Sequence, residues 1–397
     1  MITRRDTLKS MAALGLAGAL PSRALTASAE TDRRLVVIVL RGGMDGLGAV
    51  PAIGDPDFAS VRGQLGDGST PRGGDSFSLD GTFGLHASLP TLHEMWRASD
   101  LAVAHAVHSV SRNRSHFDAQ DLLETGLNHL SSTSSGWINR ALAWYGEPSR
   151  RMGLASGYAM PVIMTGANGV RIWSPRRLPE ADGALLSVLG QMGSGDAPLR
   201  DAIREGADSV ERDQRLLGAD AATSHPSIRD LEAITQLARA TGRFLGEPDG
   251  PRIATFDIDG WDTHASQTIY FSYRMPVLDG AVAALKQGLG PAWEKTAVAV
   301  VTEFGRTVRP NGTTGTDHGT ATAALIAGGA VKGGKVHADW PGLKARDLHE
   351  NRDLKPTMDI RSVFKALLIQ HMAMDPDFVE RTVFPESDFA RPVPGLV

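Results

Sequence analysis

The chain has 397 residues, a formal net charge of −4 at pH 7 and no cysteine. It can therefore form neither a disulfide nor a thiolate metal site, and its stability must come from a large hydrophobic core. Any metal would have to be held by His, Asp, Glu and hydroxyl groups, which favours hard or borderline cations. The mildly acidic balance offers no general attraction to nucleic acid or to anionic lipid.

The first 30 residues have the parts of an export signal. Arg4 and Arg5 precede the apolar run Met11–Leu20, and the small residues 27–29 follow it. A run of about ten residues is too short to cross a bilayer as a helix, and this order is typical of a secretory signal. The paired arginines, followed by Leu8 and Lys9, predict the twin-arginine route and a periplasmic or secreted protein. The alternative is an ordinary basic N-terminal helix.

Residues 31–397 are predicted to form one domain. The leader carries four basic and two acidic side chains, so the remainder has a formal charge of −6. No later segment has the roughly 18 continuous apolar residues of a membrane span, so none is expected in the mature protein. The twin-arginine translocase is the expected partner during export.

Buried strands and helices alternate along this domain. Strands are predicted at Leu35–Leu40, Leu101–Val107, Val162–Thr165, Arg252–Phe256, Ala297–Val301 and Ala321–Ile326. Helices are predicted at His86–Arg97, Ser115–Thr125, Gly136–Trp144, Leu199–Leu217, Ile228–Phe244, Pro276–Leu289 and Ile360–Gln370. The alternation predicts an α/β layered fold with a mainly parallel sheet, and the charged helical stretch at about 150–250 predicts an insertion that caps a site or covers the sheet edge.

Ligands of open α/β sheets bind beyond the carboxyl ends of the strands. Polar side chains gather at the predicted strand ends: Asp45, Arg114, Ser115, His116, Asp259, Asp262, His264, Glu303, Arg306, Asp317 and His318. Each one alone has an ordinary explanation, because such an Asp or Ser usually caps a helix and a lone His is usually structural. Together at one edge, carboxylates and imidazoles would stay unpaired unless a cation joined them.

Metal-assisted transfer of an anionic group is the chemistry that needs such a set. Cations polarise a phosphate or sulfate ester, and free N–H groups at a helix start bind its oxygens. Ser115 at such a start could act as the nucleophile. Arg112, Arg114 and Arg306 could hold an anionic substrate bidentately, or they could pair with the carboxylates of the site itself.

The polar residues at the strand ends belong to five short motifs: Arg41-Gly42-Gly43-Met44-Asp45-Gly46, Arg114-Ser115-His116-Phe117-Asp118, Gly260-Trp261-Asp262-Thr263-His264, Thr302-Glu303-Phe304-Gly305-Arg306-Thr307 and Gly315-Thr316-Asp317-His318-Gly319. In this order the motifs resemble a bacterial family called domain of unknown function 1501, and the resemblance extends over nearly the whole mature chain. Members commonly carry a twin-arginine leader. The family is similar in turn to the alkaline phosphatase and sulfatase superfamily.

This resemblance implies a three-layer α/β sandwich with a mainly parallel central sheet and one or two divalent cations, with zinc, manganese or calcium open. It implies Ser115 as the nucleophile. The metal ligands it implies are Asp45, Asp262, His264, Glu303 and His318. Substrate or supporting contacts would come from Arg114, His116, Asp259, Arg306 and Asp317.

Three departures from the superfamily pattern bear on the chemistry. Asp262 and His264 are separated by one residue where the superfamily usually has three, so Asp259 is an alternative ligand. Glu303-Phe304 replaces the usual Asp-His pair, which removes one imidazole. Without cysteine, the formylglycine mechanism of sulfatases is excluded.

Two functions are therefore predicted as alternatives. The first is an exported metal-dependent hydrolase of a phosphate or sulfate ester, acting on an anionic small molecule or polymer. The second is a non-catalytic cell-envelope binding or assembly protein that keeps the fold, since a fold alone does not determine a function. Dinucleotide binding is disfavoured, because the glycines at 42, 43, 46 and 48 do not have the Gly-x-Gly-x-x-Gly spacing.

Overall fold

The computed structural model describes residues 31–65, 76–110, 114–131, 135–146, 152–174 and 231–397. The predicted export signal, the predicted helix Leu199–Leu217 and Arg112 lie outside these residues. So does most of the predicted insertion. Within the described part of the chain, no helix is both long and apolar enough to span a membrane.

A nine-stranded sheet forms the centre of the molecule, with the strand order β10-β4-β9-β8-β1-β7-β5-β6 and β11 beside β4. Its strands are β1 (Arg34–Arg41), β4 (Leu101–His108), β5 (Gly153–Ser156), β6 (Arg171–Trp173), β7 (Ile253–Asp259), β8 (Thr296–Val301), β9 (Thr322–Ala327), β10 (Lys335–His337) and β11 (Met358–Asp359). β9 runs antiparallel to both β4 and β8, and the other pairs are parallel. The predicted mainly parallel sheet is confirmed.

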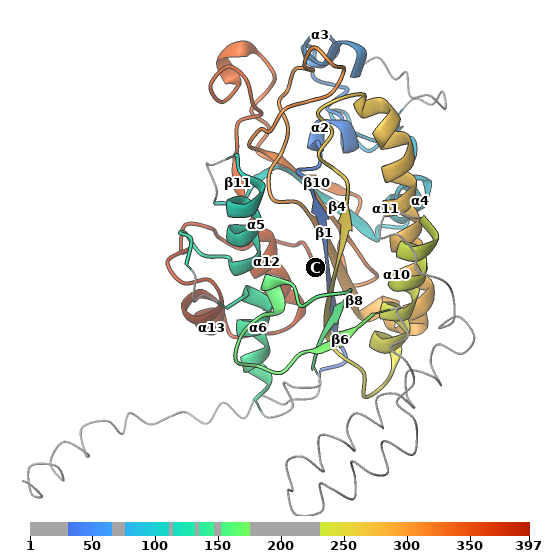
Figure 1. Ribbon diagram of the computed structural model, residues 1–397, viewed down its shortest axis with the longest axis vertical. Helices are drawn as coiled ribbons and strands as arrows, with labels where there is room; N and C mark the ends of the chain where they lie inside the picture. The colour runs from blue at the N-terminus through green and yellow to red at the C-terminus, as the bar shows by residue number, and fades with distance from the viewer. Residues whose placement is uncertain (1–30, 66–75, 111–113, 132–134, 147–151, 175–230) are drawn as a thin grey trace, which may run out of the picture.

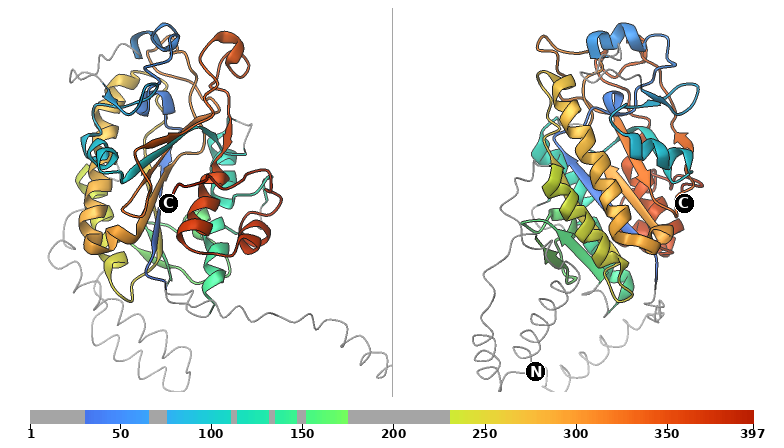
Figure 2. Two further views of the ribbon diagram at one scale, coloured as in Figure 1. Left: turned by 180° about the vertical axis from the view of Figure 1, so that it is seen from behind. Right: turned by 90° about the vertical axis from the view of Figure 1, so that its right-hand side faces the viewer.

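Helices cover both faces of this sheet. The longer ones are α4 (Pro90–Arg97), α5 (His116–Thr125), α6 (Trp137–Leu142), α10 (Leu231–Gly246), α11 (Gln267–Leu289) and α12 (Ile360–Ala366). Three short helices are also labelled in Figure 1: α2 (Gly46–Ala49), α3 (Phe58–Arg62) and α13 (Pro376–Phe378). Helices α4, α10 and α11 lie on one side of the sheet and α5, α6 and α12 on the other, and α10 and α11 run side by side in Figure 2. The predicted three-layer α/β arrangement is therefore confirmed.

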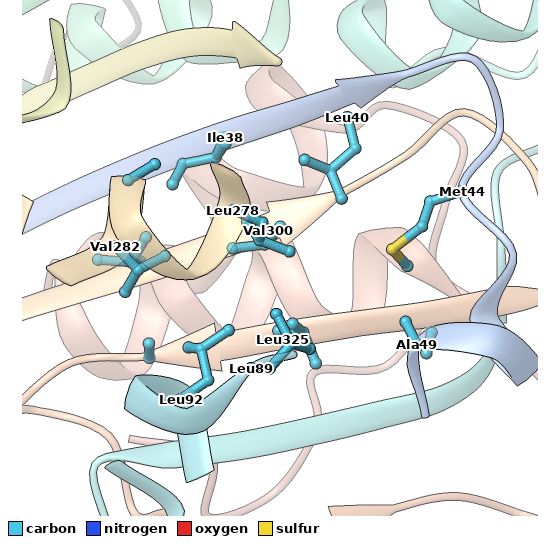
Figure 3. Close-up of a cluster of buried hydrophobic side chains, with 14 of the residues drawn as sticks. Ile38, Leu40, Met44, Ala49, Leu89, Leu92, Leu278, Val282, Val300 and Leu325 are labelled. Atoms are coloured by element: carbon cyan, nitrogen blue, oxygen red, sulfur yellow. The ribbon is translucent and has the colours of Figure 1, made fainter. Parts of the chain in front are cut away.

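The buried run of β1 supplies both cores. Val36, Ile38 and Leu40 belong to the core that contains Leu278 of α11, part of which is drawn in Figure 3. Leu35, Val37 and Val39 belong to the other core, with Phe364 of α12. Successive side chains of a strand point to opposite faces, so a strand covered on both faces is apolar at every position.

Some predicted elements have different bounds. The predicted strand Val162–Thr165 is wrong: a short 3-10 helix spans Val162–Met164 after Pro161, and its apolar signal comes from the buried Ile163 and Met164. Helix α4 begins at Pro90, because proline fits the first turn of a helix. Helix α11 begins nine residues before Pro276, which the helix includes.

The reversed direction of β9 determines where the site forms. Because β9 is antiparallel, its first residue lies at the edge where the parallel strands have their carboxyl ends. His318, four residues before β9, therefore meets Glu303, two residues after β8, at that edge.

Candidate metal centre

Three imidazoles surround the carboxylate of Asp262 at this edge. Asp262 Oδ1 lies 3.0 Å from Nε2 of His264 and 3.2 Å from Nε2 of His318, and Oδ2 lies 3.4 Å from Nε2 of His116. Ligand atoms of His116, Asp262 and His318 all lie within 4.8 Å of one another. The three residues come from the start of α5, the loop after β7 and the segment before β9. We call these three residues, with His264, the His/Asp cluster.

Each imidazole of the His/Asp cluster is held by an oxygen at its other nitrogen. Nδ1 of His116 lies 2.8 Å from Glu303 Oε1, Nδ1 of His318 lies 2.7 Å from the carbonyl oxygen of Arg114, and Nδ1 of His264 lies 3.2 Å from Asp317 Oδ1. Because carboxylate and carbonyl oxygens only accept, each Nδ1–H is the donor. When the imidazoles are neutral, this arrangement leaves the lone pair of each Nε2 facing inward, as in histidines that bind metals.

The cluster atoms fit a cation. Nε2 of His116 is buried and has no hydrogen-bond partner among the residues that the structure describes. Nε2 of His264 and Nε2 of His318 lie 3.0 Å apart. Two neutral imidazole lone pairs at that separation repel each other unless a proton or a cation lies between them. A donor set of imidazole nitrogens and one carboxylate suits zinc or another borderline divalent cation.

Glu303 supports His116 from a fully buried position. Its Oε1 accepts hydrogen bonds from the backbone N–H of Gly42 at 2.9 Å and from Gln120 Nε2 at 3.0 Å, in addition to His116. Burial acts to raise the pKa of Glu303, but the hydrogen bonds from His116 and Gln120 outweigh it and hold the pKa below its ordinary value. His116 thus lies in the cluster, and Glu303 lies behind it as a hydrogen-bond acceptor for its Nδ1–H.

Replacing Glu303 by Gln is expected to weaken metal binding about 10–100-fold, the usual cost of losing a partner behind a ligand. The substitution removes the charge that orients His116 and places an NH2 group among donors such as the Gly42 N–H. Competition with a chromogenic chelator would measure the affinity. Glu294→Gln, which changes an exposed carboxylate beside the start of β8, is the matched control. Equal affinity in the Glu303 and Glu294 variants would contradict the role given to Glu303.

Gly42 allows the β1 loop to lie against the loop that carries Asp262. Its φ is +120°, a conformation that residues with a side chain rarely adopt. A Cβ atom on Gly42 would lie 2.4 Å from the backbone nitrogen of Asp262. The glycine thus permits the close approach through which the Gly42 N–H reaches Glu303.

Asp45 has the ordinary structural role of an Asp at this position, that of a helix cap. Its side chain is 1% exposed and caps α2, with Oδ1 accepting from the N–H of Leu47 at 3.1 Å. Its Oδ2 pairs with Arg62 and accepts from Gln267 Nε2 at 2.6 Å. The predicted role of Asp45 as a metal ligand does not fit this geometry, because both oxygens are already occupied by donors.

A buried polar network connects this ion pair with the cluster. Oε1 of Gln267 accepts from Thr316 Oγ1 at 2.5 Å, and Thr316 Oγ1 lies 3.2 Å from Nε of Arg306. The side chain of Arg306 is fully buried and donates to Asp262 Oδ1 at 2.7 Å. Partial burial acts to raise the pKa of Asp262, but Arg306 outweighs it, and the pKa is lowered. Arg306 therefore holds the central carboxylate ionised and is not free to take a substrate through that contact.

Ser115 stands at the start of α5, between two residues that belong to the site. Its backbone has extended N-cap geometry, but its side chain makes no capping hydrogen bond. The residue before it gives its carbonyl oxygen to His318, and the residue after it is the cluster histidine His116. The hydroxyl is therefore close to the cluster along the chain and is not used by the helix.

Of the remaining predicted site residues, Arg114 and Asp317 lie next to the cluster and Asp259 does not. The Arg114 guanidinium is paired with Asp353 at 2.9 Å and with Glu350 at 2.6 Å. Of the two alternatives for this arginine, substrate binding or pairing with carboxylates, the structure shows the second. Asp317 accepts from His264 and from Asn311 Nδ2 at 3.0 Å. Asp259 lines a separate cavity beyond β7 and is not in the cluster.

Residues 204–383 match the family model described as "Protein of unknown function (DUF1501)". The resemblance to this family is thus matched over that segment, which is less than half of the chain. The DUF1501 segment contains Asp262, His264, Glu303 and His318, whereas Ser115 and His116 precede it. No curated protein matches the chain.

Several solved structures are similar to the chain at low sequence identity. Ps i-CgsB, crystallised with k-i-k-neocarrahexaose, has 8% identity and a TM-score of 0.46 over 91% of this chain and 77% of its own. The phosphonate monoester hydrolase of Agrobacterium radiobacter has 13% identity and a TM-score of 0.35 over 86% and 74%. The phosphonate monoester hydrolase SpPMH from Silicibacter pomeroyi has 11% identity and a TM-score of 0.42 over 91% and 76%.

Proposed function

We propose that the protein is an exported metal-dependent hydrolase of a phosphate or sulfate ester. The observation that carries the proposal is the set of three imidazoles, each held at Nδ1 by an oxygen, whose Nε2 atoms converge on Asp262. Export by the twin-arginine route is part of the same proposal and is supported by the leader sequence alone.

His116, Asp262 and His318 would hold the cation, with His264 as a fourth ligand from the exposed side of the cluster. A divalent cation bound there supplies Lewis acidity to the ester and favours the ionised form of a nearby hydroxyl. Arg306 keeps Asp262 ionised, and Glu303 keeps the Nε2 lone pair of His116 turned inward. The backbone N–H groups at the start of α5 would bind the oxygens of the anion.

Ser115 would provide the nucleophile. A bond forms between Ser115 Oγ and the phosphorus or sulfur atom of the substrate, while the bond between that phosphorus or sulfur atom and the oxygen of the leaving alcohol breaks. The Ser115 proton ends on the oxygen of the departing alcohol. Water then cleaves the serine ester, which restores the hydroxyl and releases phosphate or sulfate.

Removal of the metal is expected to abolish hydrolysis reversibly. The full chain purified from the cell envelope should contain stoichiometric metal and hydrolyse p-nitrophenyl phosphate or p-nitrophenyl sulfate. Dialysis against EDTA should remove both the metal and the activity, and stoichiometric zinc or manganese should restore both, because the charge needed for ester polarisation comes from the cation. Elemental analysis together with the release of p-nitrophenol measures the two quantities.

The outcomes separate the two predicted functions. A protein that contains metal and hydrolyses neither ester would support the cell-envelope binding protein with a structural cation. A protein that stays free of metal in metal-replete cells and after addition of zinc would overturn the proposal at its first step.

A further inference from the structure

A cavity lies on the other side of α5 residues that also reach the His/Asp cluster, with Gln120 in its lining. It is a cavity of about 470 Å³ beyond the carboxyl ends of β5 and β7, between α5, the segment 156–162 and the start of α10. That volume is within the range of about 300–1,000 Å³ that is typical of small-molecule sites. Nothing in the proposed hydrolysis uses this cavity, although α5 contributes to both places.

Negative charge predominates on the cavity wall. Four carboxylates line it, those of Asp121, Glu124, Asp257 and Asp259, against one guanidinium, that of Arg41. Arg41 is itself committed, since its Nε lies 2.8 Å from Asp257 Oδ2 and its Nη1 lies 2.8 Å from Glu124 Oε1. Among the described residues of the lining, carboxylates are therefore in excess and the single guanidinium is already paired, so the cavity disfavours an anionic ligand.

One acceptor on this wall is unused. Oδ1 of Asp257 is buried and has no hydrogen-bond partner among the described residues, whereas Oδ2 is bound to Arg41. Burial raises the pKa of Asp257 to about 6, against the opposing attraction of Arg41. An unsatisfied buried acceptor is costly, and a ligand that donates a hydrogen bond would remove that cost.

Exposed aromatic side chains complete the lining. Phe117 is 86% exposed and Tyr158 is 41% exposed, and both line the cavity. Large exposed apolar side chains beside carboxylates suit a ligand with an apolar or sugar-like body and a cationic group, because aromatic rings attract cations and cover apolar faces.

We propose that this cavity binds an amine-bearing organic molecule of about the size of an amino sugar. The ammonium group donates to Asp257 Oδ1 and to the carboxylate of Asp259, and the body of the ligand lies against Phe117. A neutral sugar would leave the excess negative charge uncompensated, and an acidic sugar would add to it.

Gln120 connects the cavity with the His/Asp cluster through hydrogen bonds. Gln120 lines the cavity, accepts from Arg41 Nη1 at 3.1 Å and donates to Glu303 at 3.0 Å. If the cluster hydrolyses an ester, the cavity is the place for the amine-bearing part of that ester. This role as a subsite rests on the proposed function, whereas binding of the amine does not.

Calorimetric titration of the full chain with glucosamine and with glucose, at about pH 7, tests the proposal. Glucosamine is expected to bind at least about tenfold more tightly than glucose, the difference expected from a charge-assisted hydrogen bond. Asp259→Asn should weaken the binding of glucosamine at least about tenfold and leave the binding of glucose unchanged. Glu294→Gln, an exposed carboxylate on the amino side of β8, should change neither.

Equal affinity for the two sugars, no saturable binding of glucosamine, or an unchanged affinity in Asp259→Asn would overturn the proposal. If the Asp259→Asn protein does not fold, Phe117→Ala replaces it as the test, because Phe117 is an exposed side chain. The proposal then requires that Phe117→Ala weaken the binding of glucosamine. Titrations repeated on protein treated with EDTA separate the two proposals. Glucosamine binding that survives without metal supports the cavity whatever the fate of the hydrolase.

Discussion

His318→Ala is expected to lose the bound metal and ester hydrolysis together. The Nε2 of His318 is 3.2 Å from Asp262 Oδ1 and 3.0 Å from Nε2 of His264, so the imidazole contacts two other cluster groups. Loss of a ligand should cost more than the roughly 10–100-fold in affinity that loss of a supporting partner costs. Metal content after gel filtration and the rate of p-nitrophenol release measure the two effects.

Ser115→Ala is the matched comparison for this variant. The Ser115 side chain makes no capping hydrogen bond, so its removal should leave α5 and the metal in place while it abolishes hydrolysis. The pair thus separates loss of the cation from loss of the nucleophile. A His318→Ala protein that retains stoichiometric metal with unchanged affinity would show that the cation is held elsewhere.

Arg62→Met is expected to lower the free energy of unfolding by about 3–5 kcal/mol, the usual cost of removing one partner of a buried ion pair. Arg62 and Asp45 have side chains that are 0% and 1% exposed. The methionine preserves part of the apolar stem but leaves the Asp45 carboxylate buried without its cation. Urea denaturation of protein without metal measures this loss separately from metal binding.

Asp45→Asn changes the other partner of this ion pair. It separates the structural role of Asp45 from its predicted role as a metal ligand. Asparagine can still cap α2, yet it leaves Arg62 buried without an anion, so stability should fall while metal content stays unchanged. Loss of metal from a folded Asp45→Asn protein would restore Asp45 as a ligand. A fall of less than about 1 kcal/mol in Arg62→Met would mean that the ion pair contributes little.

The sequence was sufficient to predict the layers of the fold. The continuous apolar run 35–40 can belong only to an element buried on both faces, and alternate residues of β1 do enter the two cores. Strands as short as β10 and β11 carry too few residues for a pattern, and their place comes from pairing with β4. The direction of β9 was also inaccessible, because an apolar strand has the same pattern in a parallel and in an antiparallel pair.

The sequence could indicate which polar residues gather at the strand ends, and Asp262, His264 and His318 do lie close together. It could not indicate what surrounds each of them, because the neighbouring side chains are distant in sequence and form no recognisable pattern. Arg62 forms an ion pair with Asp45. The N–H of Gly42 and the side chain of Gln120 donate hydrogen bonds to Glu303 and hold it behind His116. The signal that was available was the spacing of His116 and Gln120, which places them on one face of α5.

The His/Asp cluster brings together three segments that are far apart along the chain: the start of α5, the loop after β7 and the segment before β9. A cation bound there would act as a covalent cross-link does, since each ligand closes a long loop of the unfolded chain. In a protein that has no cysteine, the metal would then take the place of a disulfide. The folded state would gain stability as the concentration of free metal rises above the dissociation constant.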